Sequence, residues 1–221
     1  MDYYYYSVSA KKETSFLCFA LDFSYLCSLM IYLNDHIKDF DFDAALPLLS
    51  DERRQQALRF RHELGRKTCA AAYLLLREGL AKEYGITEKP CFDYGPHGKP
   101  VLRNHPDIHF NLSHCREAVV CALSDVPVGV DVEAVTHYKE SVARYTMNEQ
   151  ELSAILGADR PEVMFTRLWT QKEAVLKLTG EGLRDNLKTV LDDVSGLNIR
   201  TIVSPDQRYC YSVASRKRDK E

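Results

Sequence analysis

Several patterns that assign a protein to a class are missing from this 221-residue sequence. The seven cysteines are scattered and odd in number and form no Cys-x-x-Cys, so neither a disulfide framework nor a zinc site is indicated. The 29 basic residues are outnumbered by 32 acidic ones, so the chain lacks the basic surplus typical of nucleic-acid-binding proteins. A Gly-x-Ser-x-Gly hydrolase elbow is absent too. The composition, 45% hydrophobic and 28% charged, is that of a globular protein, and the cysteine usage favours a reducing, cytoplasmic setting.

The N-terminal region is unusual because residues 16–33 are mostly apolar and follow Lys11 and Lys12, as in the core of a signal peptide. Asp22 interrupts this stretch, and a carboxylate at the centre of a bilayer costs about 2.5 kcal/mol or more. No cleavage site of the Ala-x-Ala kind follows it. We therefore expect no membrane segment. A strand begins at Met30, and residues 1–29 are expected to be an N-terminal extension outside the fold.

Helical and strand-like patterns occur twice along the chain. The first half contains a strand at 30–33, a helix starting at Ser50, a helix at 66–84, a turn at 94–100, and strands at 108–112 and 118–123. The second half contains a strand at 128–135, a helix at 149–156 capped by Asn148, a helix at 161–178 ended by Gly180 and Gly182, and strands at 190–194, 199–203 and 209–213. The order predicts an α+β fold of two similar, pseudo-symmetric lobes, residues 30–126 and 127–221, although no strong sequence repeat is present.

Two carboxylates lie on one face of the strand that opens the second half. Residues 128–133 alternate with period two, so Asp131 and Glu133 project from one face while Val130 and Val132 are buried on the other. Paired oxygen ligands of this kind suit Mg²⁺. Gly129 beside them has no Cβ, so a bulky ligand could approach the backbone. An isolated Asp-x-Glu is more often part of a solvated edge strand, so this pair alone does not define a site.

The long helix carries a third acid at a matching position. Trp169, Glu173 and Lys177 follow one another at steps of four and share one stripe, with Lys172 at its border. Glu173 is a candidate third metal ligand, and Lys177 a candidate partner for a phosphate oxygen. The alternative is an exposed Glu-to-Lys pair worth roughly 0.3–0.5 kcal/mol, with Trp169 packed in the core.

Together these residues resemble a known pair of motifs. The first stands here as Gly129-Val-Asp131-Val-Glu133, and the second as Trp169-Thr-Gln-Lys172-Glu173-Ala-Val-Leu-Lys177. In this order and at this spacing, they resemble the 4′-phosphopantetheinyl transferase superfamily, specifically its surfactin-synthetase-activating type with two lobes in one chain. The segments Phe110-Asn-Leu-Ser-His114, Gly98-Lys99-Pro100 and Gly180-Glu-Gly182 also resemble segments of that family. The resemblance covers roughly residues 30 to 215.

The resemblance implies a reaction and a site. A member of this family would transfer the phosphopantetheine arm of coenzyme A to a serine of an apo acyl or peptidyl carrier protein. Asp131, Glu133 and Glu173 would hold Mg²⁺ against the diphosphate of coenzyme A, with Glu173 as the general base and Lys177 beside the leaving phosphate. The resemblance assigns further contacts with the coenzyme to Ser113, His114, Lys99, Lys172 and either Arg66 or Lys67, neither of which aligns without a shift.

Two other functions use the same residues. One is a binding module that holds coenzyme A or a carrier protein without chemistry, and the other is a Mg²⁺-dependent phosphohydrolase with water as the nucleophile. Carrier proteins present acidic helices, so candidate contacts on this chain are Arg53, Arg54, Arg59 and Arg61, although a solvated helix face is the ordinary role of such residues. We expect a monomer, because two lobes in one chain complete the site, and no nucleic acid or membrane as partner.

Overall fold

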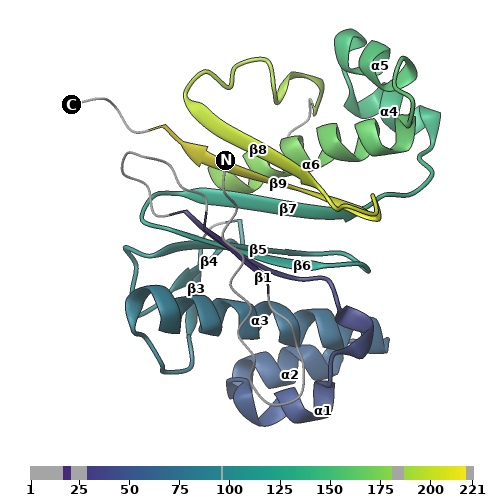
Figure 1. Ribbon diagram of the computed structural model, residues 1–221. Helices are drawn as coiled ribbons and strands as arrows, with labels where there is room; N and C mark the ends of the chain where they lie inside the picture. The colour runs from purple at the N-terminus through teal and green to yellow at the C-terminus, as the bar shows by residue number, and fades with distance from the viewer. Residues whose placement is uncertain (1–16, 21–28, 96, 181–186, 218–221) are drawn as a thin grey trace.

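The computed structural model describes residues 17–20, 29–95, 97–180 and 187–217. Two antiparallel sheets pack face to face, and each carries a long helix on its outer face (Figure 1). The layers therefore run α3, first sheet, second sheet, α6. This combination of helices with antiparallel strands confirms the α+β class. In the part of the chain that the structure describes, no helix is both long and apolar enough to cross a membrane.

The first sheet belongs to the N-terminal half of the chain. Its strand order is β1 (Leu17–Ala20), β2 (Met30–Asn34), β6 (Val119–Ser124) and β5 (His109–His114). The long helix α3 (Glu63–Tyr84) covers the outer face and buries Tyr32, Cys121 and Leu123 of the sheet. The remaining elements of this half are η1 (Ile37–Asp39), α1 (Phe42–Ala45), η2 (Leu46–Leu48), α2 (Asp51–Arg59) and the hairpin of β3 (Phe92–Tyr94) with β4 (Pro100–Leu102).

The second sheet belongs to the C-terminal half. Its strand order is β7 (Val128–Ala134), β9 (Tyr209–Arg216) and β8 (Leu197–Val203). Helix α6 (Pro161–Thr179) covers the outer face through Ala174, Val175 and Leu178. Two shorter helices and a 3-10 turn flank it: α4 (Glu140–Thr146), α5 (Glu149–Leu156) and η3 (Leu187–Thr189). The chain passes from one sheet to the other between Ser124 and Val128.

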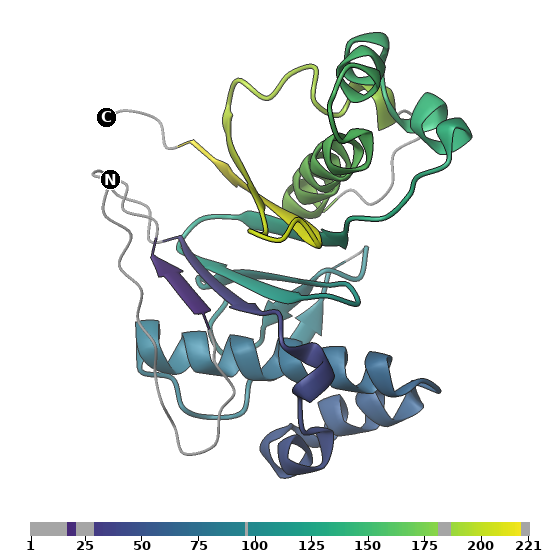
Figure 2. The same cartoon turned by 45° about the vertical axis from the view of Figure 1, so that its right-hand side comes forward.

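The two sheets lie against each other (Figure 2), and a shared apolar core joins them. The side chains of Val128, Val130 and Val132 on β7 pack against those of Ile31 and Val120 on the first sheet, and all five are at most 1% exposed. Alternation along β7 then turns Asp131 and Glu133 toward α6. The fold thus places both acids between a sheet and a helix. The similarity of the two lobes to each other stays a prediction.

Helix ends follow the capping residues in the sequence. Ser50 accepts a hydrogen bond from Arg53 N at the start of α2, and Asn148 and Glu151 form a capping box on α5. Pro161 opens α6, and Gly180, with φ of 72°, ends it in the left-handed conformation that glycine adopts without strain. The expected role of Gly182 lies outside the described residues.

Several segments differ from the sequence prediction. The predicted strand at 190–194 is wrong, because these residues continue the turn of η3 and strand pairing begins only at Leu197. Helix α4 was not predicted, and α3 begins at Glu63, three residues early. Leu17–Ala20 pair with β2 as an edge strand, so four residues of the expected N-terminal extension lie in the first sheet. The other residues of 1–28 lie outside the described part of the chain.

Candidate active site

Strand β7 and helix α6 touch backbone to backbone at Gly129. A Cβ on Gly129 would lie 2.1 Å from the carbonyl oxygen of Ala174 and 2.4 Å from the amide nitrogen of Leu178. The sequence suggested that the missing Cβ lets a ligand approach the backbone. In the structure, the backbone of α6 occupies that space. The missing side chain therefore brings Glu173 and Lys177 on α6 within reach of Asp131 on β7.

Asp131 forms the centre of a buried polar cluster. Its side chain is 3% exposed, and Oδ1 accepts hydrogen bonds from Ser113 Oγ at 2.9 Å and Lys177 Nζ at 2.7 Å. Lys177 Nζ also donates to Ser113 Oγ at 2.9 Å. Three elements, β5, β7 and α6, thus supply three side chains that contact one another. The structure brings these predicted residues together from both halves of the chain.

Glu133 and Glu173 lie in the electrostatic field of Asp131. Burial, followed by the negative charge of Asp131, raises the pKa of Glu133 to about 7, although Lys177 and a hydrogen bond from Trp169 oppose the rise. Burial and Asp131 likewise raise the pKa of Glu173 above its ordinary value. The surroundings of both glutamates therefore disfavour additional negative charge and favour a cation.

The described residues contain no group of three His, Cys, Asp or Glu side chains gathered closely enough to hold a metal ion. Lys177 supplies the positive charge beside Asp131 instead. The donor set nevertheless fits a divalent cation, because Oδ2 of Asp131 is buried and has no hydrogen-bond partner among the described residues. A cation would also relieve the repulsion that raises the pKa values of Glu133 and Glu173.

Two side chains of β5 join the first sheet to the free edge of β7. Asn111 Oδ1 accepts from Val130 N at 2.8 Å, and Ser113 Oγ accepts from Val132 N at 3.2 Å. Both side chains are 7% exposed. The resemblance assigned Ser113 to the coenzyme and gave Asn111 no role. The two-residue spacing of Asn111 and Ser113, which matches that of Val130 and Val132, is the signal that could have identified this contact.

His114 follows Ser113 at the end of β5 and is the exposed member of the pair. The residue as a whole is exposed, but neighbouring atoms partly desolvate the ring; this desolvation and the nearby charge of Lys177 lower the pKa of His114 below its ordinary value. The imidazole is therefore neutral at pH 7. Neutral imidazole can still donate one hydrogen bond to a phosphate oxygen.

Lys99 reaches across the junction of the two halves. Its Nζ donates to three backbone carbonyls, Lys177 O at 2.7 Å, Val128 O at 3.2 Å and Leu178 O at 3.3 Å. Lys99 comes at the end of the turn predicted at 94–100. Its side chain is half-buried, and burial lowers its pKa. The ammonium neutralises the C-terminal end of α6, and its three N–H groups are occupied there.

Lys172 lies apart from the other predicted residues. Its side chain is fully buried, pairs with Glu151 Oε1 at 2.9 Å and donates to Leu187 O at 2.8 Å. A phosphate contact, as the resemblance implied, would require this ammonium to leave the core. The structure therefore corrects that expectation, because the side chain of Lys172 ties α6 to α5 and η3.

Arg66 and Lys67 lie in the first turns of α3, and their polar contacts are local. Arg66 Nε donates to Phe60 O at 2.9 Å. Lys67 Nζ donates to Lys38 O at 2.9 Å and pairs with Glu63 at the same distance. Their expected contact with a phosphate stays a prediction.

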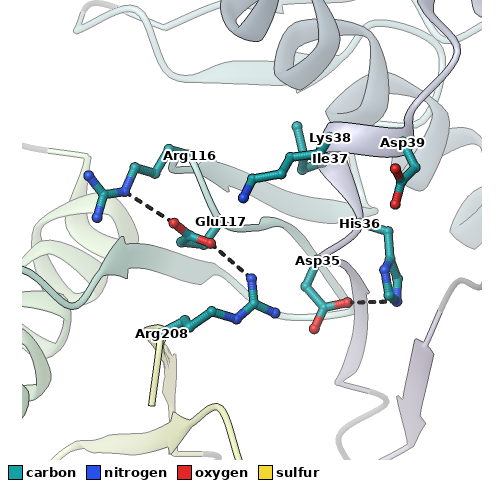
Figure 3. A pocket seen from close by; sticks show the side chains of 8 residues that line it. All are labelled: Asp35, His36, Ile37, Lys38, Asp39, Arg116, Glu117 and Arg208. Atoms are coloured by element: carbon teal, nitrogen blue, oxygen red, sulfur yellow. Dashed lines mark hydrogen bonds and ion pairs between the residues drawn. The ribbon is translucent and has the colours of Figure 1, made fainter. Parts of the chain in front are cut away.

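A pocket of about 130 Å³ opens at the seam between the two halves (Figure 3). Two of its three cations have an acidic neighbour: Arg116 Nε lies 3.1 Å from one oxygen of Glu117, and Arg208 Nη1 lies 2.9 Å from the other. The charged groups that line it are Asp35, Asp39 and Glu117 against Lys38, Arg116 and Arg208, with His36 beside Asp35. Because the charges balance, this pocket has no surplus with which to select an anion.

Comparison with known proteins gives a consistent result. Residues 127–219 match the model of the 4′-phosphopantetheinyl transferase superfamily. The chain is 34% identical over 163 residues to the 4′-phosphopantetheinyl transferase psf-1 of Bacillus pumilus, covering 72% of this chain and 70% of that protein. It is 28% identical over 156 residues to Sfp of Bacillus subtilis strain 168 (69% and 70%) and 35% identical over 150 residues to HetI of Nostoc sp. PCC 7120 (64% and 63%), both also named 4′-phosphopantetheinyl transferases. With its acids and lysine assembled between β7 and α6, the chain belongs to the 4′-phosphopantetheinyl transferase superfamily.

Proposed function

We propose that this enzyme transfers the 4′-phosphopantetheine arm of coenzyme A to a serine of an apo acyl or peptidyl carrier protein. The serine oxygen forms a bond to the β-phosphorus of coenzyme A, the bridging P–O bond breaks, and adenosine 3′,5′-bisphosphate leaves. The relatives named above carry this activity in their names. A binding module without chemistry finds no support, because Asp131, Glu173 and Lys177 are all present and adjacent.

The observation that carries the proposal is the cluster around Asp131. Lys177 Nζ lies 2.7 Å from Asp131 Oδ1. Burial and the nearby negative charge of Asp131 raise the pKa values of Glu133 and Glu173. Phosphoryl transfer requires stabilisation of charge on phosphate oxygens and a group that takes the proton of the nucleophile. This cluster contains one ammonium and two carboxyl groups of raised proton affinity, which meet both needs.

Asp131, Glu133 and Glu173 are the residues that would hold Mg²⁺. The unpartnered Oδ2 of Asp131 is the strongest support for this assignment. When bound, the metal would neutralise charge on the diphosphate. Within the chain, Glu173 would take the serine proton, and Lys177 would donate a hydrogen bond to the leaving phosphate. Ser113 orients both Asp131 and Lys177.

Beyond the cluster, we keep the coenzyme contacts that the resemblance implies only for side chains that are accessible in the structure. His114 is exposed beside Lys177, so we assign it to the nucleotide side, with Arg66 or Lys67 at the 3′-phosphate. Lys99 and Lys172 are not carried into this site, because carbonyls and Glu151 engage their ammonium groups. We propose that residues 30–126 and 127–221 act as two lobes of a monomer.

The carrier partner would approach on its acidic helices. Of the four arginines considered, Arg53 stacks over Tyr73 at 5.4 Å and Arg54 donates to Leu46 O at 3.3 Å. Arg59 and Arg61 remain exposed and are the better candidates for contact. Attraction of this kind is screened by salt, so the KM for the carrier would rise with ionic strength.

Incubation with coenzyme A, Mg²⁺ and an apo carrier, followed by mass spectrometry of the carrier, tests the function. We expect the carrier to gain one phosphopantetheine and the gain to stop when EDTA removes the metal. Asp131→Asn and Glu173→Gln should each lose at least about a hundredfold in rate. Glu162→Gln, which changes a half-buried acid in the first turn of the same helix, is the matched control and should retain the activity.

Two results would contradict parts of this proposal. Free phosphopantetheine released without modification of any carrier in a panel would indicate a phosphohydrolase. If Glu173→Gln abolished turnover but left Mg²⁺ affinity unchanged, Glu173 would be a base and not a ligand.

A further inference from the structure

Lys177 lies in the last turn of α6, where a helix depends on partners outside itself. The last four carbonyls of an α-helix have no hydrogen-bond partner within the helix. At the end of α6, Leu176 O accepts from Gly180 N at 2.9 Å. The next two carbonyls, Lys177 O and Leu178 O, accept from Lys99 Nζ at 2.7 and 3.3 Å. A side chain from the N-terminal half of the chain therefore fastens the helix turn that carries Lys177.

The same ammonium group joins α6 to β7. Lys99 Nζ donates to Val128 O at 3.2 Å, one residue before Gly129, where the backbones of strand and helix touch. Asp131 lies further along the same strand. Lys99 therefore helps to set the spacing between the strand that carries Asp131 and the helix turn that carries Lys177.

Lys99 itself starts from a well-defined turn between β3 and β4. Gly95 N donates to Lys99 O at 3.0 Å, and Gly98 N donates to Gly95 O at 2.9 Å. Gly98 has φ of 77°, a conformation that glycine adopts without strain. A Cβ on Gly180 would lie 3.6 Å from Lys99 Cδ, so the aliphatic part of the lysine passes close to the glycine that ends α6. Both the base and the stem of this side chain are thus held in place.

We propose that Lys99 is a positioning residue for the transfer reaction and acts through Lys177. The inference rests on the proposed function, because it uses the role given there to Lys177. Lys99 holds the backbone of Lys177, while Asp131 and Ser113 hold its ammonium group at 2.7 and 2.9 Å. Without the Lys99 ammonium, the last turn of α6 loses two hydrogen bonds and a favourable charge at its C-terminal end. The turn then frays, and Lys177 meets the leaving phosphate less often.

Lys99→Met tests the proposal by steady-state kinetics with coenzyme A, Mg²⁺ and an apo carrier. We expect kcat to fall by about tenfold or more, because a displacement of about 1 Å in a catalytic group can cost about a hundredfold in rate. The KM for coenzyme A, and its affinity by calorimetry, should change by no more than about twofold, because the three N–H groups of Lys99 bond to carbonyls.

Lys89→Met is the matched control. Lys89 Nζ also donates to two backbone carbonyls, Pro47 O at 3.0 Å and Leu49 O at 2.7 Å, but these belong to η2 and the residue that follows it. Its loss should leave kcat within about twofold of the wild-type value, because neither β7 nor α6 is touched.

A double variant separates positioning from a general structural defect. Lys177→Met alone should lower kcat by about a hundredfold. In that background Lys99 has no ammonium left to position, so adding Lys99→Met should lower kcat by no more than about a further twofold. A general defect would instead multiply the two losses.

If Lys99→Met does not fold, Lys99→Arg takes its place in the same measurements. Arginine keeps the positive charge and N–H donors, but its planar group cannot point at three carbonyls as a tetrahedral ammonium does. A smaller loss of kcat is expected, again with little change in the KM for coenzyme A and no added loss beside Lys177→Met.

The outcomes distinguish this inference from the proposed function. If the Lys99 variant weakens coenzyme A binding and keeps its kcat, Lys99 contacts the coenzyme, and the inference is overturned while the function stands. Losses that multiply in the double variant also overturn it. If the wild-type protein modifies no carrier in a panel, the proposed function fails and the inference fails with it. A selective, non-additive loss of kcat supports both.

Discussion

At the scale of single residues, the buried pair of Lys172 and Glu151 has a measurable consequence. Lys172→Met would leave the Glu151 carboxylate in the core without its counter-charge, which costs about 3–5 kcal/mol. Adding Glu151→Gln removes the charge and keeps an oxygen that can accept from Asn148 N. We expect urea unfolding to show a large loss in the free energy of unfolding for the single variant. The double variant should recover at least half of that loss.

A double variant no more stable than Lys172→Met would show that the ammonium acts through its bond to Leu187 O and not through its charge. Double-variant comparison is suited to this question because it separates the pair from its surroundings.

The cysteines give a second prediction at this scale. Burial raises the pKa of Cys115 to about 11, and thiolate is the reactive form, so its alkylation rate should rise about tenfold for each pH unit between 7 and 10. Among the five cysteines whose side chains the structure describes, Cys91 is exposed and should be modified first at pH 8, whereas the fully buried Cys121 should react only after unfolding. Peptide mapping after iodoacetamide treatment measures each rate. Equal rates for Cys91 and Cys115 at pH 8 would contradict the prediction.

Side-chain direction could be predicted from sequence where the backbone determines it. Period-two alternation correctly turned Asp131 away from Val130 and Val132. The partners of the Lys99 and Lys172 ammonium groups could not be predicted. A long, flexible side chain reaches residues that are distant in sequence, Leu178 and Glu151 respectively. The metal and coenzyme assignments in the site stay predictions.

At the scale of elements, the close approach of β7 and α6 depends on Gly129. A Cβ there meets backbone atoms at 2.1 and 2.4 Å, and backbone cannot move aside as a flexible side chain can. Gly129→Ala should therefore destabilise the protein by about 3 kcal/mol or more and reduce activity by shifting α6. Gly196→Ala is the control, because its Cβ meets open space, and should change stability by no more than about 0.5 kcal/mol. Thermal unfolding measures the stability of both variants, and the transfer assay measures their activity. A stable, active Gly129→Ala variant would contradict the prediction, because it would show that α6 can move away from β7.

Elements with explicit end signals were predicted well. Ser50, Asn148 and Gly180 gave the ends of three helices because capping is a local interaction. Helix α4 is short and leaves Val142 and Tyr145 exposed, so it shows no apolar periodicity. The stretch 190–194 has apolar residues at both ends but Asp192 and Asp193 in a turn, and its pattern was mistaken for a strand.

At the scale of the whole molecule, the face-to-face packing of the sheets could not be predicted from local pattern. It depends on side chains far apart in sequence, such as Ile31 and Val213. It also depends on the hydrogen bond that Asn111 Oδ1 accepts from Val130 N and on the one that Lys99 Nζ donates to Val128 O. Alternation in the sequence predicted which face of each sheet is apolar. It did not predict that the apolar faces of the two sheets pack against each other. The active-site cluster also depends on the packing of the two halves, because Ser113 lies in the N-terminal half and Asp131 and Lys177 lie in the C-terminal half.

The shared core predicts that the C-terminal half cannot fold as a monomer, although the family match lies within it. Residues 127–221 alone would expose Val128, Val130 and Val132, each fully buried in the whole chain and each worth about 1.5 kcal/mol or more. That loss is comparable with the entire stability of a typical domain. Circular dichroism on heating should show no cooperative transition, or ultracentrifugation should show self-association through the exposed sheet face. A monomeric fragment with a sharp transition would contradict the prediction, because it would mean that the second sheet and α6 are stable without the first sheet beneath them.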